Sequence, residues 1–247
     1  MFLSQKPYII AHRGSRPENT MQGFLTAKKN GCHMYECDVR LSKDQVPMVI
    51  HDKKIDRTTD KKGYVTHLTS KEMISFGIPT FEHLAAFISS QPTTALVVEF
   101  KSMKWWWKNI ALVDKVLALT HQYSITHRCI FISFKPSIVS YLKSQSDEYN
   151  LDIHIGYLYG PFKGFFLHND PFTIARKYMI DSLWLHHSLI NDEVVEKCKA
   201  NSLDIYAWTV NNHTDICRMT DLNISGIVTD FPELYMSSPP SPPLTYP

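Results

Sequence analysis

The sequence predicts a (β/α)₈ barrel of the TIM type, an α/β fold in which eight parallel strands alternate with helices. Short apolar or β-branched runs recur along the 247 residues, and helical patterns separate most of them. The alternative is an open doubly wound sheet, but no GxGxxG motif opens the first helix. The runs cover residues 8–11, 34–39, 94–100, 129–134, 153–159, 182–186, 204–208 and 225–229.

Helices are expected between these runs. The first covers residues 20–30, because Asn19 is a typical N-cap and Gly31 is a typical C-terminal stop. Another begins near Thr80, and Pro136 occupies a favoured first helical position. Further helices are expected over 107–122, 191–201 and 213–221.

Residues 46–79 do not follow this alternation. A short extra strand is expected from Val46 to His51, and the polar segment that follows contains breaking glycines. We interpret 46–79 as a small insertion at the end of the barrel where the strands finish, with an insertion subdomain over about residues 52–78. The rest of 1–236 then forms one domain, and the Pro-rich segment 237–247 is a polyproline-like tail outside it.

The composition excludes several classes of protein. Lys and Arg total 26 and Asp and Glu total 24, a near balance that argues against a nucleic-acid partner. The five cysteines form no CxxC pair, so neither a disulfide framework nor a zinc site is expected. The N-terminus lacks the pattern of a signal peptide, and no apolar run is long enough to span a bilayer, which predicts a cytoplasmic protein.

Three carboxylates lie at the ends of predicted strands. Side chains at positions i and i+2 of a strand share a face, so Glu36 lies beside Asp38, and Glu99 lies beside Lys101. Such carboxylates are costly to bury unless something pairs them. They could be unrelated rim residues or salt-bridge partners, but together they favour one divalent cation, Mg²⁺ or Ca²⁺, with Mn²⁺ as a third option.

Two histidines share this end of the predicted barrel. His12 ends the first strand beside Arg13, and His51 ends the extra strand beside Asp52. Imidazoles transfer protons near neutral pH, and Arg13 and Lys101 supply fixed positive charge. The set therefore indicates metal-assisted cleavage of a phosphate ester. The pair His186 and His187 is expected to be structural or solvent-facing instead.

Short motifs at the strand ends follow one another in a characteristic order. They are HRG at 12–14, ENT at 18–20, ECD at 36–38, HD at 51–52, DRTT at 56–59, EFK at 99–101, WTVN at 208–211 and GIVTDFP at 226–232. This order resembles the glycerophosphodiester phosphodiesterase family from about residue 8 to 234, with 103–200 weakly matched. Cys37, Gln45 and Ser225 depart from the family pattern without removing a ligand or catalytic group.

The resemblance implies an activity and a role for each motif residue. The activity is metal-dependent hydrolysis of a small glycerophosphodiester to an alcohol and glycerol 3-phosphate, through a cyclic phosphate formed by the neighbouring glycerol hydroxyl. His12 and His51 would be the general acid and base, in an order that the sequence leaves open. Glu36, Asp38 and Glu99 would hold the metal, and the substrate or its phosphate would contact Arg13, Lys101, Glu18, Asn19 and Trp208.

Three alternatives remain at this point. Trp105, Trp106 and Trp107, together with Phe162, Phe165 and Phe166, fall in loops at the same end of the barrel. They are either ordinary packing or a rim for lipid, and the second reading favours a lysophospholipase D with peripheral lipid contact. A phosphoinositide-type lyase would stop at the cyclic product, and a catalytically silent barrel would serve as a binding module.

Overall fold

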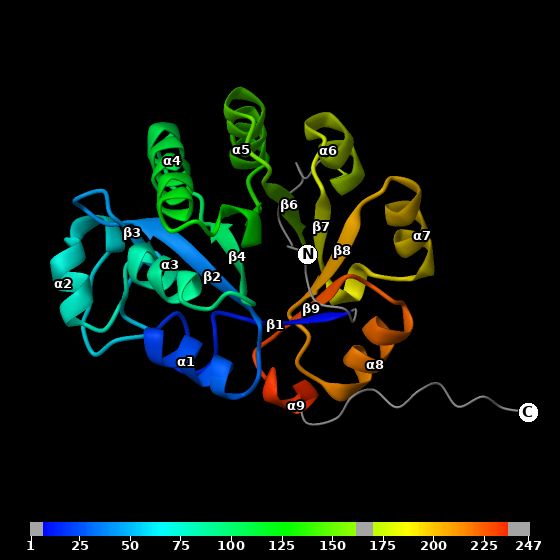
Figure 1. Cartoon of the computed structure of the whole chain (residues 1–247), viewed down its shortest axis with the longest axis horizontal. Coiled ribbons are helices and arrows are strands. Elements are labelled where there is room, and N and C mark those ends of the chain that lie inside the picture. The colour runs from blue at the N-terminus through cyan, green and yellow to red at the C-terminus, as the bar shows by residue number, and fades with distance from the viewer. Residues whose placement is uncertain (1–6, 162–169, 237–247) are drawn as a thin grey trace, which may run out of the picture.

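The computed structural model describes residues 7–161 and 170–236 and contains a closed barrel. Eight strands pair in parallel in the order β1-β9-β8-β7-β6-β5-β4-β2, and β1 also pairs with β2, which closes the ring. The strands are β1 (Tyr8–Ala11), β2 (Met34–Leu41), β4 (Ala95–Phe100), β5 (Cys129–Ser133), β6 (His154–Tyr159), β7 (Ser182–His186), β8 (Asp204–Trp208) and β9 (Gly226–Thr229). The predicted fold is confirmed, and Figure 1 shows the strands at the centre with helices around them.

The helices alternate with the strands. They are α1 (Met21–Lys29), α2 (Ser70–Ser75), α3 (Phe81–Ser89), α4 (Trp106–Gln122), α5 (Pro136–Tyr149), α6 (Pro171–Tyr178), α7 (Asp192–Ala200), α8 (His213–Asp221) and α9 (Glu233–Met236). Short 3₁₀ turns are η1 (Val65–His67), η2 (Thr126–Arg128) and η3 (His187–Leu189). None of the described helices is long and apolar enough to cross a membrane.

The predicted N-cap of the first helix is wrong by one residue. Thr20 caps α1, because its hydroxyl accepts a hydrogen bond from the Gly23 amide. Asn19 instead has a left-handed backbone with φ of 54°, and its amide side chain turns inward to Asp38. The polar side chain is therefore available to the interior of the barrel rather than to the helix.

Alternate residues of each strand face the inside of the barrel. On β4, Val97 belongs to the inner apolar cluster, whereas Leu96 and Val98 pack in the outer cluster that also includes helix residues. Trp184 fills the interior, stacked on Tyr206 at 4.1 Å between ring centroids. Gly156 makes room for it, since a Cβ there would lie 2.4 Å from Trp184 Nε1. Because side chains two residues apart share a face, the residue two positions after Val97, Glu99, also faces the interior, at the end where the strands finish.

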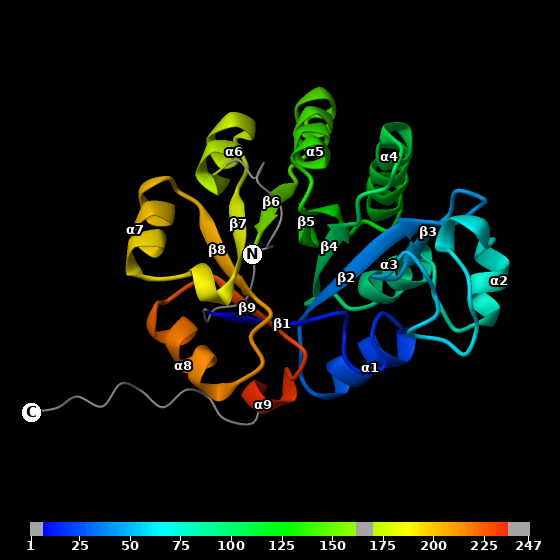
Figure 2. The same cartoon turned by 180° about the vertical axis from the view of Figure 1, so that it is seen from behind.

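The insertion begins with β3 (Pro47–Val49), which pairs antiparallel with β2. Figure 2 shows β3 and α2 at one side of the barrel, seen from behind. The segment has its own apolar cluster, made of Met48, Ile50, Ile55, Val65, Met73 and Ile78. The division into a domain of 1–236 and a subdomain of about 52–78 stays a prediction. The tail 237–247 and Phe162, Phe165 and Phe166 lie outside the described residues.

Candidate functional site

Most of the predicted site residues meet at the ends of the strands. A cavity of about 230 Å³ is lined by seven of the ten: His12, Arg13, Glu36, His51, Glu99, Lys101 and Trp208. Asp38 is fully buried beside it. Glu18 and Asn19 do not line the cavity but contact charged residues at its edge, Arg13 and Asp38.

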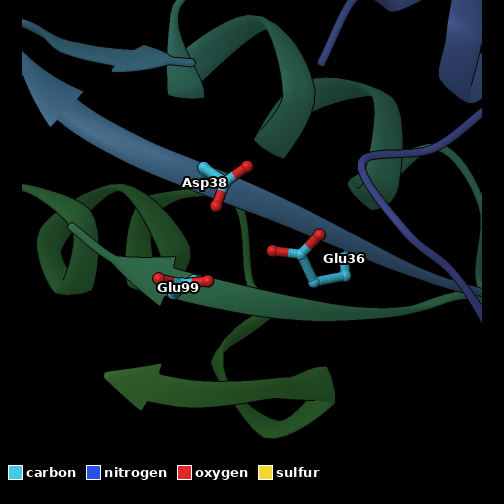
Figure 3. Close-up of side chains that lie close together, drawn as sticks. All are labelled: Glu36, Asp38 and Glu99. Carbon is cyan, nitrogen blue, oxygen red and sulfur yellow. The ribbon is translucent and has the colours of Figure 1, made fainter. Parts of the chain in front are cut away.

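The three carboxylates form one buried cluster. One oxygen of each of Glu36, Asp38 and Glu99 lies within 4.8 Å of the others, and the side chains come from the paired strands β2 and β4 (Figure 3). Among the described residues, Glu36 Oε1 is buried with no hydrogen-bond partner. Asp38 Oδ1 lies 2.9 Å from Lys101 Nζ but lacks hydrogen-bond geometry. Buried oxygens left in this state fit a hard divalent cation, which takes oxygen ligands.

The charges in the cluster are unequal. Burial and the neighbouring charge of Asp38 raise the pKa of Glu36 to about 8. Burial would also raise the pKa of Asp38, but Lys101 and Arg13 outweigh it and hold that pKa well below its usual range. A divalent cation that binds there would favour the ionised form of Glu36, so its binding would oppose this rise in pKa.

Two fixed cations hold Asp38. Arg13 Nε lies 3.1 Å from Asp38 Oδ2, and Lys101 Nζ bridges Asp38 to Glu99 Oε1. The Arg13 backbone has a left-handed φ of 54°, and its amide donates to Glu36 Oε2 at 2.9 Å. A non-glycine residue in this region costs about 1–3 kcal/mol and is held there by its surroundings. The loop after β1 is thus shaped to bring Arg13 onto the carboxylates.

Asn19 and Glu18 form hydrogen bonds that hold this loop in place. Asn19 Nδ2 donates to Asp38 Oδ2 at 2.8 Å, and its own amide donates to the carbonyl of Arg13. Glu18 accepts from Arg13 Nη1 at 3.0 Å and from both Nη atoms of Arg57, which belongs to the insertion. Both residues orient the charged groups of the cavity rather than facing it.

Each histidine in the cavity is paired with a carboxylate. His12 Nδ1 lies 2.6 Å from Asp230 Oδ1, and His51 Nδ1 lies 2.6 Å from Asp52 Oδ1. The pKa values of Asp230 and Asp52 are lowered, in each case against the effect of burial, by hydrogen bonds that include the histidine. An ionised carboxylate only accepts, so Nδ1 donates in both pairs and Nε2 is left for the cavity.

The partners of the two carboxylates differ. Asp230 follows β9 and accepts from Asn211 Nδ2 at 2.6 Å. Asp52 accepts from Arg57 Nε at 2.6 Å. Asp230, Asn211 and Arg57 belong to motifs of the sequence, but the sequence alone predicted no role for them. A carboxylate directly after the last strand was the available signal for Asp230, because strand ends meet at one face of the barrel.

Apolar and aromatic side chains form the opposite wall of the cavity. Trp208 stands edge-on to Phe134 at 5.3 Å between centroids, and its Nε1 donates to the carbonyl of Trp184. His186 packs edge-on against the Trp208 ring at 5.3 Å. Next to it, His187 Nδ1 lies 3.3 Å from Asp215, outside the cavity lining. The cavity thus has a charged half and an apolar half.

Comparisons with known proteins agree with this arrangement. The model of the glycerophosphoryl diester phosphodiesterase family matches residues 11–234. A glycerophosphodiester phosphodiesterase of Caldanaerobacter subterraneus subsp. tengcongensis is 32% identical over 244 residues, which cover 92% of this chain and 96% of that protein. A glycerophosphodiester phosphodiesterase of Bacillus altitudinis is 28% identical over 242 residues, 91% of this chain and 95% of that one.

Solved structures share the fold. A phosphodiesterase of Oleispira antarctica in complex with the product sn-glycerol-3-phosphate superposes with a TM-score of 0.82 at 23% identity, covering 94% of this chain and 96% of that one. A glycerophosphodiester phosphodiesterase of Thermotoga maritima gives a TM-score of 0.74 at 24% identity, covering 95% and 99%. At these identities the likeness establishes the barrel.

Proposed function

This chain belongs to the glycerophosphoryl diester phosphodiesterase family and is a phosphodiester hydrolase, and from that premise we propose how it works. A divalent cation, Mg²⁺, Ca²⁺ or Mn²⁺, binds Glu36, Asp38 and Glu99, and His12 and His51 are the general acid and base. The buried carboxylate cluster beside two carboxylate-paired histidines in one cavity is the observation that carries the proposal.

The charged half of the cavity suits a phosphodiester. Arg13 and Lys101 both line it and form ion pairs with the buried Asp38. Their positive charges are therefore largely shielded from bulk water and can stabilise a phosphate in the cavity. When bound, a divalent cation would add charge neutralisation at the non-bridging phosphate oxygens. Trp208 walls the opposite side, where the organic part of the substrate would pack.

The two histidines face the cavity through Nε2 and would divide the proton transfers. One accepts the proton of the glycerol hydroxyl next to the phosphate, whose oxygen attacks phosphorus. The other donates a proton to the departing alkoxide, which leaves poorly without it. Water then opens the cyclic phosphate, with the roles reversed, and glycerol 3-phosphate is released. The Asp230 and Asp52 carboxylates hold each ring in the tautomer that this requires.

The metal is tested by turnover of glycerophosphocholine and glycerophosphoethanolamine. Activity should disappear in EDTA and return with Mg²⁺, Ca²⁺ or Mn²⁺, and glycerol 3-phosphate should be the product. Phosphorus NMR separates hydrolysis from a lyase, since only the lyase would leave cyclic phosphate as the final product. Full activity in protein shown to be metal-free would contradict the assignment of Glu36, Asp38 and Glu99.

A second substrate class is favoured by one observation. Trp105, Trp106 and Trp107 are all more than 40% exposed and begin four residues after Lys101, which lines the cavity. The three rings are therefore only partly buried, which ordinary packing into the core does not explain. A lysophospholipase D would use such a surface for an acyl chain, and comparison of lysophosphatidylcholine with glycerophosphocholine as substrates tests it.

A further inference from the structure

An exposed aromatic cluster follows β4 on the rim of the barrel. Trp105, Trp106 and Trp107, the tryptophan cluster, are 47%, 43% and 60% exposed. The rings of Trp105 and Trp107 stack on each other with centroids 5.0 Å apart. Trp106 stands edge-on to Tyr141 of α5 at 6.1 Å. Trp105 and Trp107 thus pack on each other and Trp106 packs on Tyr141, and each of the three rings still leaves apolar surface toward solvent.

The cluster has a fixed place beside the cavity. Asn109, which is 4% exposed, accepts a hydrogen bond from the Met103 amide at 2.8 Å and donates to the Met103 carbonyl. This bond pins the loop between Lys101, which lines the cavity, and Trp105. Helices of the barrel start at the face where the strands end, so the cluster lies at the active-site end.

The charged residues that flank the cluster along the chain have one sign. Residues 101–108 contain three lysines and no acidic residue. Lys104 is exposed with its Nζ 5.1 Å from the centre of the Trp105 ring, and Lys108 follows Trp107 directly. The described first turn of α4 also contains no acidic residue, although the positive end of a helix favours one. Lys104 and Lys108 therefore flank the three tryptophans on both sides along the chain.

We propose that the tryptophan cluster, with Lys104 and Lys108, docks the protein on the surface of a bilayer that contains anionic phospholipid. Tryptophan rings favour the level of the lipid headgroups, and lysines nearby are attracted to anionic lipid. The charge selects this occupant over a second copy of the chain, because two copies of a positive surface repel each other. Docking is a property separate from hydrolysis. Because the cluster lies at the same end of the barrel as the cavity, docking would turn the cavity toward the lipid surface.

Vesicle flotation tests the proposal directly. Vesicles of phosphatidylcholine with phosphatidylglycerol should bind the wild-type chain, and tryptophan fluorescence should shift to the blue on binding. The shift reports the cluster, since Trp184 is buried and Trp208 is partly covered in the cavity wall. A second series with phosphatidylcholine alone should show much weaker binding.

Two variants separate the aromatic and electrostatic contributions. Trp105→Ala/Trp107→Ala should weaken vesicle binding at least about tenfold, because each ring covers on the order of 100 Å² when it is inserted. Lys104→Gln/Lys108→Gln should weaken binding to the phosphatidylglycerol vesicles by about fivefold per lysine and leave binding to phosphatidylcholine unchanged. Trp107→Ser, the most exposed position, replaces the double variant if that one does not fold.

Tyr149→Ala is the matched control. Tyr149 is 61% exposed at the C-terminal end of α5, on the opposite face of the barrel, so its loss should not change vesicle binding. All variants should keep wild-type kcat/KM on the water-soluble glycerophosphocholine, which shows that the cavity is intact.

Three results would overturn the proposal. One is a wild-type chain that does not bind phosphatidylglycerol vesicles, and another is a tryptophan variant that binds them as well as wild type. The third is a wild-type dimer that Trp105→Ala/Trp107→Ala dissociates, since the cluster would then be covered by a second copy. A wild-type chain that binds these vesicles but does not turn over glycerophosphocholine would instead count against the proposed function alone.

Discussion

The two histidine–carboxylate pairs look alike but are built from different parts of the molecule. His12 and Asp230 come from the ends of β1 and β9, neighbouring barrel strands, and Asn211 holds the carboxylate. His51 and Asp52 follow β3 and are held by Arg57 from the insertion. The His12 ring is more buried than the His51 ring, with 18% of its side chain exposed against 33%. One pair is therefore part of the scaffold, and the other depends on an added segment.

The position of His12 is therefore fixed more firmly than the position of His51. The backbone of β1 is bonded to β9 along its length, so the position of His12 is fixed by the barrel itself. His51 is placed by the Ile50 amide bonded to the Asp38 carbonyl and by its own carbonyl, which accepts from Arg40 Nε at 2.7 Å. Site residues on regular elements are held more closely than those on loops. Changes in the insertion should therefore act on catalysis through His51.

The largest expected effect comes from removing either ring. His12→Ala and His51→Ala should each lower kcat by on the order of 10²–10⁴-fold, the range for loss of a general acid or base. Both residues follow strands, so the fold should persist by circular dichroism. His127→Ala, an exposed histidine in η2 just before β5, is the matched control and should keep wild-type kcat. A folded His12 or His51 variant with near-normal kcat would refute that residue's role.

Sequence reasoning reached the parts of this site that depend on local periodicity. The period of two along a strand placed Glu36 beside Asp38 and Glu99 beside Lys101, and the structure brings the three carboxylates together. It could not assign Asp230, which lies 218 residues from His12, because such a contact depends on closure of the barrel. Arg57 reaches Glu18 across 39 residues, a contact that depends on how the insertion folds against the loop after β1.

Local reasoning also failed where two residues competed for one role. Asn19 and Thr20 are both good N-caps, and the sequence gives no way to choose between them. The left-handed turn at Asn19 settles the choice, since it directs the side chain to Asp38 and leaves Thr20 to cap α1. The start of α1 is therefore set by a tertiary contact, the hydrogen bond from Asn19 to the buried Asp38 carboxylate.

The carboxylates provide the next largest effect. Asp230→Asn should lower kcat by on the order of 10²-fold, and Asp52→Asn by about tenfold, because an ion pair in a less polar setting interacts more strongly. Asp230 is paired with the more buried ring, since 18% of the His12 side chain is exposed against 33% of the His51 side chain, although the two carboxylates themselves are similarly exposed. Steady-state kinetics on glycerophosphocholine measure both. Equal losses would remove the distinction drawn between the two pairs.

A smaller effect is expected from Arg57, which is 49% exposed and bonded to Asp52 and Glu18. Exposed ion pairs contribute about 0.2–1 kcal/mol, so Arg57→Gln should lower kcat no more than about fivefold. Since Arg57 would act through Asp52, the change should cost much less in an Asp52→Asn background than in wild type. Additive losses in the double variant would mean that Arg57 acts by another route.

The smallest effect is a difference in titration between the two rings. In metal-free protein, burial lowers the pKa of His12, but Asp230 and Glu36 outweigh it and raise that pKa above 6.5. Burial, together with the charges of Lys101 and Arg13, lowers the pKa of His51 below 6.5 despite Asp38 and Asp52. NMR titration of the imidazole carbons in EDTA should therefore show His12 protonated at a pH where His51 is neutral.

The two shifts also act on stability with opposite sign. A raised pKa means that the folded state binds the proton more tightly, so the contribution of His12 is complete below pH 6.5 and is lost as the pH rises through its folded pKa. A lowered pKa has the reverse effect: His51 favours the folded state above pH 6.5 and ceases to do so as the pH falls through its folded pKa. Urea unfolding of the metal-free protein should show that His12→Gln lowers the free energy of unfolding mainly below pH 6.5. His51→Gln should raise the free energy of unfolding relative to wild type in the same acidic range. The same pH dependence in both variants would show that the scaffold pair and the insertion pair are electrostatically equivalent.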